Sequence, residues 1–171
     1  MTGWTLKGGV HSEGENAPFW KTTPLNRMTP GQWESVCDRC GRCCLHKIED
    51  EATGRIIYTS LACRLLDRES CLCVDYENRR RVIPWCVSLT PSTADLHWLP
   101  STCSYRLLAR GKDLPWWHPL VSETAQSVHD AGMSARSMAL REKLVHPKGL
   151  EDCLDETDRD LVPLKREKEE K

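Results

Sequence analysis

The sequence predicts a small, irregular α+β fold, richer in helix than in strand, in a single cysteine-rich domain. The chain has 171 residues, which is enough for one ordinary domain. Signals that start or stop helices and strands recur at short intervals, so the elements should be short. The hydrophobic fraction is 39% and includes ten cysteines, which leaves a thin apolar core. Cores of this kind are usually supplemented by disulfides or metal ions.

The first helix signal follows a polar leader. Residues 1–17 are rich in Gly, Ser and Glu and are expected to be a flexible leader. The apolar segment Pro18–Trp20 then begins the domain. Thr29 can cap a helix, Pro30 suits its first position, and Gln32 lies three residues after the cap. A short helix should therefore end just before the first cysteine.

Strand signals are concentrated in the middle of the chain. The run Arg55–Thr59 is rich in β-formers and is the best strand candidate. A second strand is expected over Ala62–Leu66, turning through Asp67–Ser70 toward two further cysteines. Cys71 and Cys73 would then share one face of a hairpin, because side chains alternate along a strand.

The C-terminal half is predicted to be mainly helical. Ser101–Arg110 should form a helix that Gly111 stops, with Cys103 in its first turn. A further helix should be capped at Ser122 and run toward Ala131. Residues 133–145 fit a strand and a helix equally well.

Composition also indicates the boundaries and the compartment of the domain. Residues 151–171 are rich in charge and are expected to be a flexible tail, which leaves 18–150 as the cysteine-cluster domain. The net charge of −1 gives no global attraction to nucleic acid or to an anionic membrane. Neither a secretory signal peptide nor a long apolar span is visible. We therefore expect a cytoplasmic protein, in which reduced thiols bind metal rather than form disulfides.

The cysteine spacing is the strongest chemical signal in the chain. Four thiols fall within the eight residues Cys37–Cys44, spaced C-x2-C-x2-C-C. Thiolates suit zinc, iron–sulfur clusters and Cu(I). The triple two-residue spacing is typical of one face of a [4Fe–4S] cluster in bacterial-type ferredoxins, whereas paired C-x2-C units are typical of zinc sites. The usual C-x3-C-P continuation and a second clean C-x2-C are both missing, so an iron–sulfur cluster and zinc stay open.

Most of the cysteines are predicted to be metal ligands. The predicted set is Cys37, Cys40, Cys43, Cys44, Cys63, Cys73, Cys86 and Cys103. Adjacent thiols seldom face one tetrahedral ion, so one of Cys43 and Cys44 should point into a first site and the other toward a second site or the core. One cluster plus a zinc ion, and one binuclear centre, are both compatible with this set. His46 would be a ligand or a hydrogen-bond partner of the centre.

The same residues resemble a known family. The likeness is carried by Cys37–Cys44, Cys63, Cys73–Tyr76 and Pro84–Cys86, and it is to the CxxCxxCC cysteine-cluster proteins, described as zinc- or iron-chelating domains. Later segments, Trp98–Pro100, Cys103–Leu108 and Gly111–Leu120, resemble one bacterial branch, the uncharacterised protein family 0260. The resemblance covers about residues 18–145 and implies a bacterial protein with a metal or iron–sulfur centre. It implies no particular reaction.

Three functions are compatible with these observations. The first is a metal- or iron–sulfur-binding protein whose centre is structural or redox-active, with metal ions as partners. Its ligands would be Cys37, Cys40 and Cys43 with a distant thiolate, Cys86 or Cys63. The second is an enzyme that uses the centre as a Lewis acid or redox group, which needs an open coordination position beside a pocket. The third is a zinc-organised module that binds protein or RNA.

Other candidate sites carry weaker signals. The basic run Arg79–Arg81 fits a nucleic-acid contact, but a solvated face is the more common meaning in a chain of this charge. The aromatic run Trp116–His118 fits a ligand pocket or a wall of the core. Asp113 and His118 are an acid–base pair only if they meet near a nucleophile. Cys71 or Cys103 is the candidate for a reactive cysteine.

Overall fold

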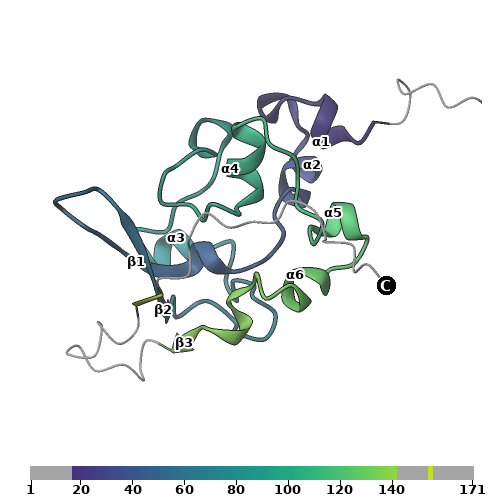
Figure 1. The fold of residues 1–171 in the computed structure, drawn as a ribbon. Helices are drawn as coiled ribbons and strands as arrows, with labels where there is room; N and C mark the ends of the chain where they lie inside the picture. The colour runs from purple at the N-terminus through teal and green to yellow at the C-terminus, as the bar shows by residue number, and fades with distance from the viewer. Residues whose placement is uncertain (1–16, 142–153, 156–171) are drawn as a thin grey trace, which may run out of the picture.

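Short helices open the described part of the chain (Figure 1). The structure, a computed structural model, describes residues 17–141 and 154–155. Helix α1 (Phe19–Thr22) and the 3-10 turn η1 (Leu25–Arg27) lead into α2 (Pro30–Ser35). The backbone amide of Gln32 donates to Thr29 Oγ1, and Thr29 N donates to Gln32 Oε1. The predicted helix start is therefore confirmed as a reciprocal capping box.

The cysteine run leads from α2 into a sheet. After the 3-10 turn η2 (Arg42–Cys44) the chain forms β1 (Leu45–Glu49), which pairs antiparallel with β2 (Ile56–Ala62). The register shifts between Leu45 and Lys47, so β1 carries an irregularity directly after the cysteines. The predicted strand at Arg55–Thr59 is confirmed by β2, whereas its partner β1 was not predicted.

Two short strands complete a mixed sheet around β2. Strand β3 (Leu140–Arg141) runs parallel to β2, and β4 (Leu154–Asp155) runs antiparallel to it. The predicted strand Ala62–Leu66 is wrong, because β2 ends at Ala62 and one isolated bridge, Leu66 to Cys73, follows. Cys71 has a φ of 57°, a left-handed value that interrupts the pleat, so Cys71 and Cys73 do not share a strand face.

The remaining elements are short helical segments of three to six residues. They are α3 (Arg79–Val82), η3 (Pro91–Thr93), α4 (Ser104–Ala109), α5 (Pro119–Ser122), α6 (Ser127–Asp130) and η4 (Ala135–Ser137). Cys103 is the residue that precedes α4 rather than part of its first turn. The single helix predicted from Ser122 to Ala131 is wrong, because Glu123 takes a left-handed φ of 60° and separates α5 from α6.

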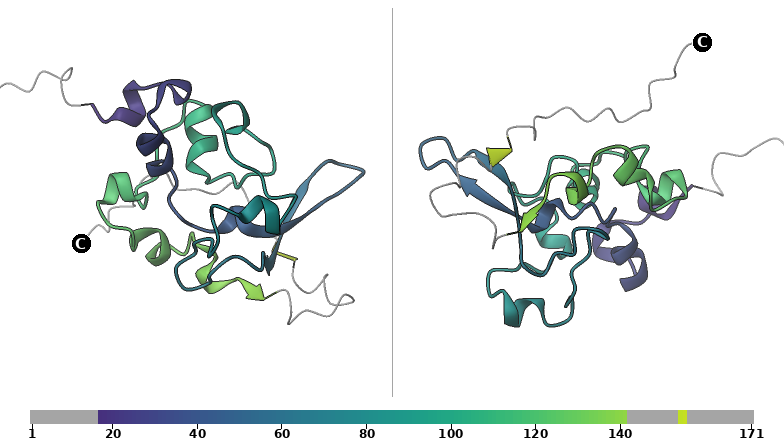
Figure 2. Two further views of the ribbon diagram at one scale, coloured as in Figure 1. Left: turned by 180° about the vertical axis from the view of Figure 1, so that it is seen from behind. Right: turned by 90° about the horizontal axis from the view of Figure 1, so that it is seen from below.

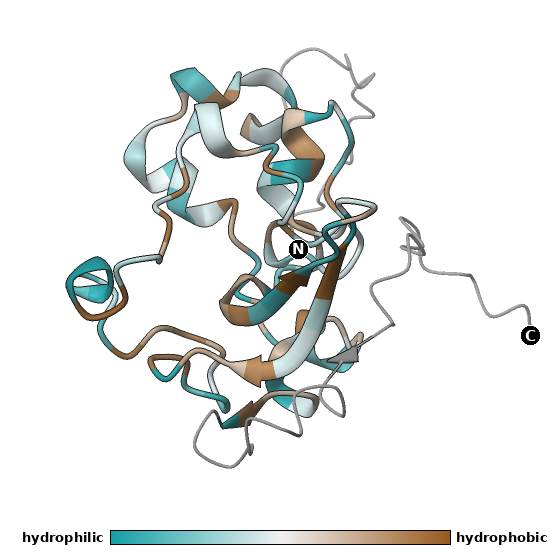
Figure 3. Ribbon diagram, turned by 90° about the vertical axis from the view of Figure 1, so that its left-hand side faces the viewer, coloured by the Kyte–Doolittle hydropathy of each residue, from teal (hydrophilic) through white to brown (hydrophobic). Residues whose placement is uncertain are grey.

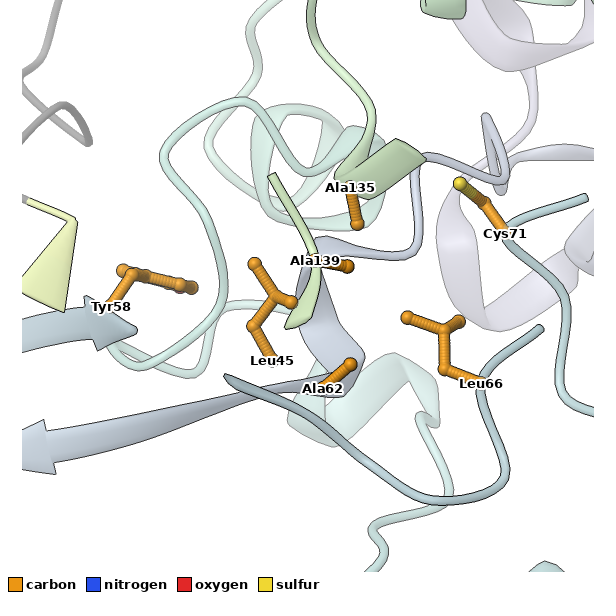
Figure 4. Packing of buried hydrophobic residues seen from close by; sticks show 7 residues of the cluster. All are labelled: Leu45, Tyr58, Ala62, Leu66, Cys71, Ala135 and Ala139. Carbon is orange, nitrogen blue, oxygen red and sulfur yellow. The ribbon is translucent and has the colours of Figure 1, made fainter. Parts of the chain in front are cut away.

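The hydrophobic core is divided into small clusters. One lies beside the sheet and contains Leu45, Tyr58, Ala62, Leu66, Cys71, Ala135 and Ala139 (Figure 4). A second joins α2 to α4 through Val36, Ala94 and Tyr105, and a third contains Cys40, Trp117 and Val128. Figure 3 shows that hydrophobic residues are distributed over several segments of the chain rather than gathered in one layer. The fold is thus α+β and irregular, with more helix than strand, as predicted.

The described residues also bear on the expected boundaries. No helix among them is both long and apolar enough to cross a bilayer. The predicted leader, residues 1–17, lies almost entirely outside the described residues, and so do most of the predicted tail, 151–171, and the end of the expected domain, 18–150. These boundaries stay predictions.

Candidate metal centre

The cysteine run is shaped by local backbone chemistry. Asp38, which is buried, accepts a hydrogen bond from Cys40 N at 3.1 Å through Oδ1, so the first two-residue loop is an Asx turn. Gly41 then takes a left-handed φ of 72°. A Cβ on Gly41 would stand 3.1 Å from the Cβ of Cys71, so both the angle and the close packing require glycine.

Four of the predicted ligands form a first thiol group beside α2 and α4. Negative charge on Cys43 and on Cys103 raises the pKa of Cys37. Negative charge on Cys43 and on Cys37 likewise raises the pKa of Cys40. The carboxylate of Asp38 acts on all of these thiols, so it lies among them. The first thiol group is Cys37, Cys40, Cys43 and Cys103.

The other four predicted ligands are linked to one another through Cys44 and Cys86, and we call them the second thiol group. Negative charge on Cys43, Cys63 and Cys86 raises the pKa of Cys44. The pKa of Cys86 is raised in the same way by charge on Cys63, Cys73 and Cys43. The backbone supports this arrangement, since Cys63 N donates to Cys44 O at 2.9 Å. The second thiol group is Cys44, Cys63, Cys73 and Cys86.

The adjacent cysteines therefore lie at the junction of the two groups. Their thiols are hydrogen-bonded, and this bond lowers the pKa of Cys43 and raises that of Cys44. Cys43 is exposed as a residue, although desolvation of its thiol opposes the lowering of its pKa. Lys47 lies near it and helps to lower its pKa, with Nζ 2.9 Å from Cys43 O.

Burial controls the acidity of the remaining thiols of the first group. Desolvation raises the pKa of Cys37 and Cys40 far above the usual value of a thiol, and it raises that of Cys103 to about 12. These cysteines are therefore protonated at neutral pH unless a cation is bound. Metal binding would displace their protons.

Cys71 stands apart from both groups. Its side chain is buried in the cluster beside the sheet, near Leu66 and Ala135 (Figure 4). Burial raises its pKa, and the groups that lower it are the hydroxyl of Ser134, the charge of Arg136 and nearby backbone amides rather than another thiol. All nine described cysteines, Cys71 included, are free thiols. A buried thiol with a raised pKa is a weak nucleophile, which does not favour the idea that Cys71 is reactive.

His118 is a structural residue. It is fully buried, and Leu120 N donates to its Nδ1 at 3.0 Å, which leaves Nε2 to carry the proton. Nε2 then donates to Val36 O at 2.9 Å. Asp113 is instead exposed and pairs with Lys21, its Oδ2 lying 2.6 Å from Nζ. The acid–base pair considered for Asp113 and His118 is therefore not formed, because both groups are engaged elsewhere.

The other sequence candidates fall in different surroundings. Trp117 is buried in the third core cluster, which fits a wall of the core. Arg79 lies near Cys86, whereas Arg80 and Arg81 are exposed. His46 lies on β1, and a metal-binding role for it stays a prediction. Asp38 and Lys47 were missed as neighbours of the thiols, although an acid one residue after Cys37 is a recognisable Asx-turn signal.

The thiol groups are neighbourhoods rather than closed coordination sites. Among the described residues, no group of three or more His, Cys, Asp or Glu side chains is placed so that it could hold a metal ion. A cavity of about 450 Å³ lies elsewhere, between the N-terminal turns and the end of α4. It is lined by residues 20–25, Met28, Leu108 and 111–113, none of which is a cysteine.

Comparisons with known proteins identify the family of this chain. Residues 36–104 match the family model CxxCxxCC, described as a "putative zinc- or iron-chelating domain". The chain is 54% identical over 134 residues to a UPF0260 protein of Gluconacetobacter diazotrophicus, which covers 78% of this chain and 84% of that protein. It is 58% identical over 120 residues to one of Mesorhizobium japonicum, covering 70% and 81% of the two chains. It is 52% identical over 138 residues to one of Sinorhizobium fredii, covering 80% and 89%. No solved structure matches. The chain belongs to the UPF0260 family of bacterial proteins.

Proposed function

We propose that this protein binds metal through two thiolate centres, one formed by each thiol group. The first would use Cys37, Cys40, Cys43 and Cys103, and the second would use Cys44, Cys63, Cys73 and Cys86. The division of eight thiols into two groups of four supports this proposal, because four sulfurs complete the coordination of a zinc ion or the corners of one cluster. The adjacent cysteines would supply one ligand to each centre.

The donor set fits soft metals. Positively charged side chains near the thiols also favour bound thiolates, since Lys47 lies by Cys43 and Arg79 lies by Cys86. A centre of four thiolates carries net negative charge with either zinc or an iron–sulfur cluster, and cations beside it reduce the cost of burying that charge. Either metal would give a centre of the kind that the family description names.

The same donor count favours a structural or electron-transfer role over metal catalysis. A catalytic metal keeps one position open for water or substrate, whereas four protein sulfurs leave none. The cavity of about 450 Å³ has no cysteine in its lining, so the proposed centres would not face it. We infer a cytoplasmic protein whose centres are structural or redox-active, with reduced thiols available to metal.

Metal analysis tests the proposal. The protein is purified without oxygen, and zinc, iron and acid-labile sulfide are measured per chain. We expect two zinc ions, two clusters, or one of each. A colourless protein without iron or sulfide would exclude the cluster version, and a protein without any bound metal would exclude the proposal.

Three cysteine variants test the division into two centres. Cys40→Ser should lose the metal of the first centre, and Cys86→Ser that of the second. Cys71→Ser is the matched control for Cys40→Ser, because Cys71 is also buried but lies in neither group. If Cys40→Ser and Cys86→Ser each lose all metal at once, a single binuclear centre replaces the two proposed here.

A further inference from the structure

The cavity beside α4 is large enough for a small molecule. It lies between the N-terminal turns and the C-terminal end of α4, and its volume of about 450 Å³ is within the usual range of ligand sites. The N-terminal turns (purple) and α4 lie at the end of the molecule away from the β1–β2 hairpin (Figure 2). Neither proposed metal centre uses this space.

Two turns of the backbone leave the cavity open. Thr23 is extended between α1 and η1, with a φ of −105° and a ψ of 116°, so the chain does not continue as one helix over the end of α4. Gly111 turns the chain after α4 with a left-handed φ of 67°. A Cβ on Gly111 would meet no atom within 4 Å, so this corner of the cavity is unfilled.

The inner wall of the cavity is apolar and fixed by the core. Leu25, Met28 and Leu108 line it, and they also pack against the second core cluster. Trp20 is half-buried beside them, and Phe19 holds its ring edge to face, with the ring centroids 5.5 Å apart and an interplanar angle of 89°. Such a wall suits an aromatic or branched apolar group.

The rim of the cavity carries one uncompensated positive charge. Lys21 and Asp113 neutralise each other, since Nζ lies 2.6 Å from Oδ2. Desolvation raises the pKa of Asp113, but Lys21 and the nearby Trp20 indole outweigh it and lower the pKa. Lys112 is exposed, and its side chain has no hydrogen bond or ion pair with any residue that the structure describes. The three charged residues of the lining therefore sum to +1.

We propose that this cavity binds a small organic monoanion, a carboxylate joined to an aromatic or branched apolar body. The apolar body would lie against Trp20 and Leu108. The carboxylate would pair with Lys112 and accept a hydrogen bond from the hydroxyl of Thr23, which also lines the cavity. One negative charge on the ligand matches the single uncompensated charge of the rim. The site is separate from both thiol groups and does not require either proposed metal centre.

A phosphorylated ligand fits this lining less well. A phosphate dianion is usually held by several backbone N–H groups or by a bidentate Arg, and none of the lining residues is an arginine. Lys112 alone would leave half of the charge of a dianion without a partner. A neutral apolar ligand would gain nothing from the ammonium group. The combination of an apolar wall and one free cation therefore favours the monocarboxylate.

Isothermal titration calorimetry of the full chain, purified without oxygen, tests the site with a matched pair of probes. 4-Phenylbutyrate has the carboxylate and the apolar body, whereas 4-phenylbutyramide has the same body without charge. In buffer of low ionic strength we expect the acid to bind with a dissociation constant at or below about 1 mM. The amide should bind about threefold to fivefold more weakly, which is the value of one exposed ion pair. Absence of binding at about 10 mM acid, or equal binding of acid and amide, would overturn the proposal.

Two variants place the binding in this cavity. Lys112→Gln should weaken binding of the acid about threefold to fivefold and leave binding of the amide unchanged. Arg80→Gln is the matched control, because Arg80 is also exposed but lies on α3, outside the lining. Thr23→Trp should fill the cavity and abolish binding of both probes, with metal content unchanged. If Thr23→Trp does not fold, Lys112→Gln still decides, since its side chain is exposed. Binding of the acid that Lys112→Gln does not change, or that Arg80→Gln weakens equally, would overturn the assignment to this cavity.

Discussion

The two thiol groups are supported by different kinds of structure. Around the first, Val36 is fully buried before Cys37, Tyr105 OH donates to Trp33 O at 2.8 Å, and His118 Nε2 donates to Val36 O. Around the second, Cys73 and Cys86 lie in irregular chain between exposed residues. The comparison indicates that packing already organises the first group, whereas the second would depend more on the metal that we propose it binds.

Loss of a ligand should have the largest effect, and it should differ between the groups. Cys40→Ser removes a buried thiol from the third core cluster and, under our proposal, a metal ligand as well, so we expect about 3 kcal/mol or more to be lost from the free energy of unfolding. Cys86→Ser should cost less, because its neighbours are exposed. Denaturant unfolding of both variants measures the difference.

The cysteine control makes this prediction sharper. Cys71→Ser places a hydroxyl in an apolar cluster, which should cost about 1–3 kcal/mol without loss of metal. A Cys40→Ser protein with full metal content and unchanged melting would show that Cys40 is not a ligand. Equal losses for Cys40→Ser and Cys86→Ser would break the comparison between the groups.

The glycine of the cysteine run should be the next most sensitive position. Gly41→Ala places a Cβ 3.1 Å from the Cβ of Cys71 at a φ of 72°, so clash adds to backbone strain. We expect a loss of about 2–4 kcal/mol and weaker metal retention. Gly111→Ala is the control, because its φ is 67° but no atom lies within 4 Å. It should lose only the backbone cost of about 1–2 kcal/mol.

Acid should destabilise the support of the first group through His118. Burial holds the pKa of His118 below its ordinary value of 6.5 in the folded state. Below that value the unfolded chain binds a proton that the folded chain does not, so the free energy of unfolding falls as the pH falls. His118→Asn should be less stable at pH 7 and should lose less stability on acidification.

The contribution of His118 is isolated by comparing how steeply the free energy of unfolding falls with pH in the natural chain and in His118→Asn. His129, whose pKa burial also lowers, remains in the variant and keeps part of the acid sensitivity. Protonation of metal-bound thiolates acts in the same direction in both proteins and cancels in the difference. If the natural chain and His118→Asn lose stability in parallel between about pH 7 and pH 5, His118 is not the neutral, buried group described here.

Local signals in the sequence predicted local features of this molecule. Thr29 and Gln32 form the capping box that their spacing predicts, and Gly41 takes a left-handed φ of 72°, a value that glycine adopts readily. Both depend only on residues close in the chain. The thiol partners of the run come from residues 63–103, and no spacing rule states which of them meets which end of Cys37–Cys44.

Features that depend on tertiary contacts were the ones missed. β1 begins at Leu45, directly after Cys44, and its sequence has little strand signal of its own. It forms a strand because it pairs with β2. In sequence Cys71 is expected to share a strand face with Cys73, but it takes a left-handed φ and its side chain lies in the core instead. His118 looks like a catalytic base until its two backbone hydrogen bonds are known.

The smallest effect should come from Arg79, which acts on the second group alone. Its side chain stacks on Tyr76 and bonds Ser88, so Arg79→Ala loosens the two stretches that hold Cys73 and Cys86. The partly exposed contacts should cost about 1 kcal/mol or less in stability. Metal release to a chelator should nevertheless become faster for one centre and stay unchanged for the other. Equal release from both centres, or from neither, would mean that the loop around the second group is already fixed without its arginine.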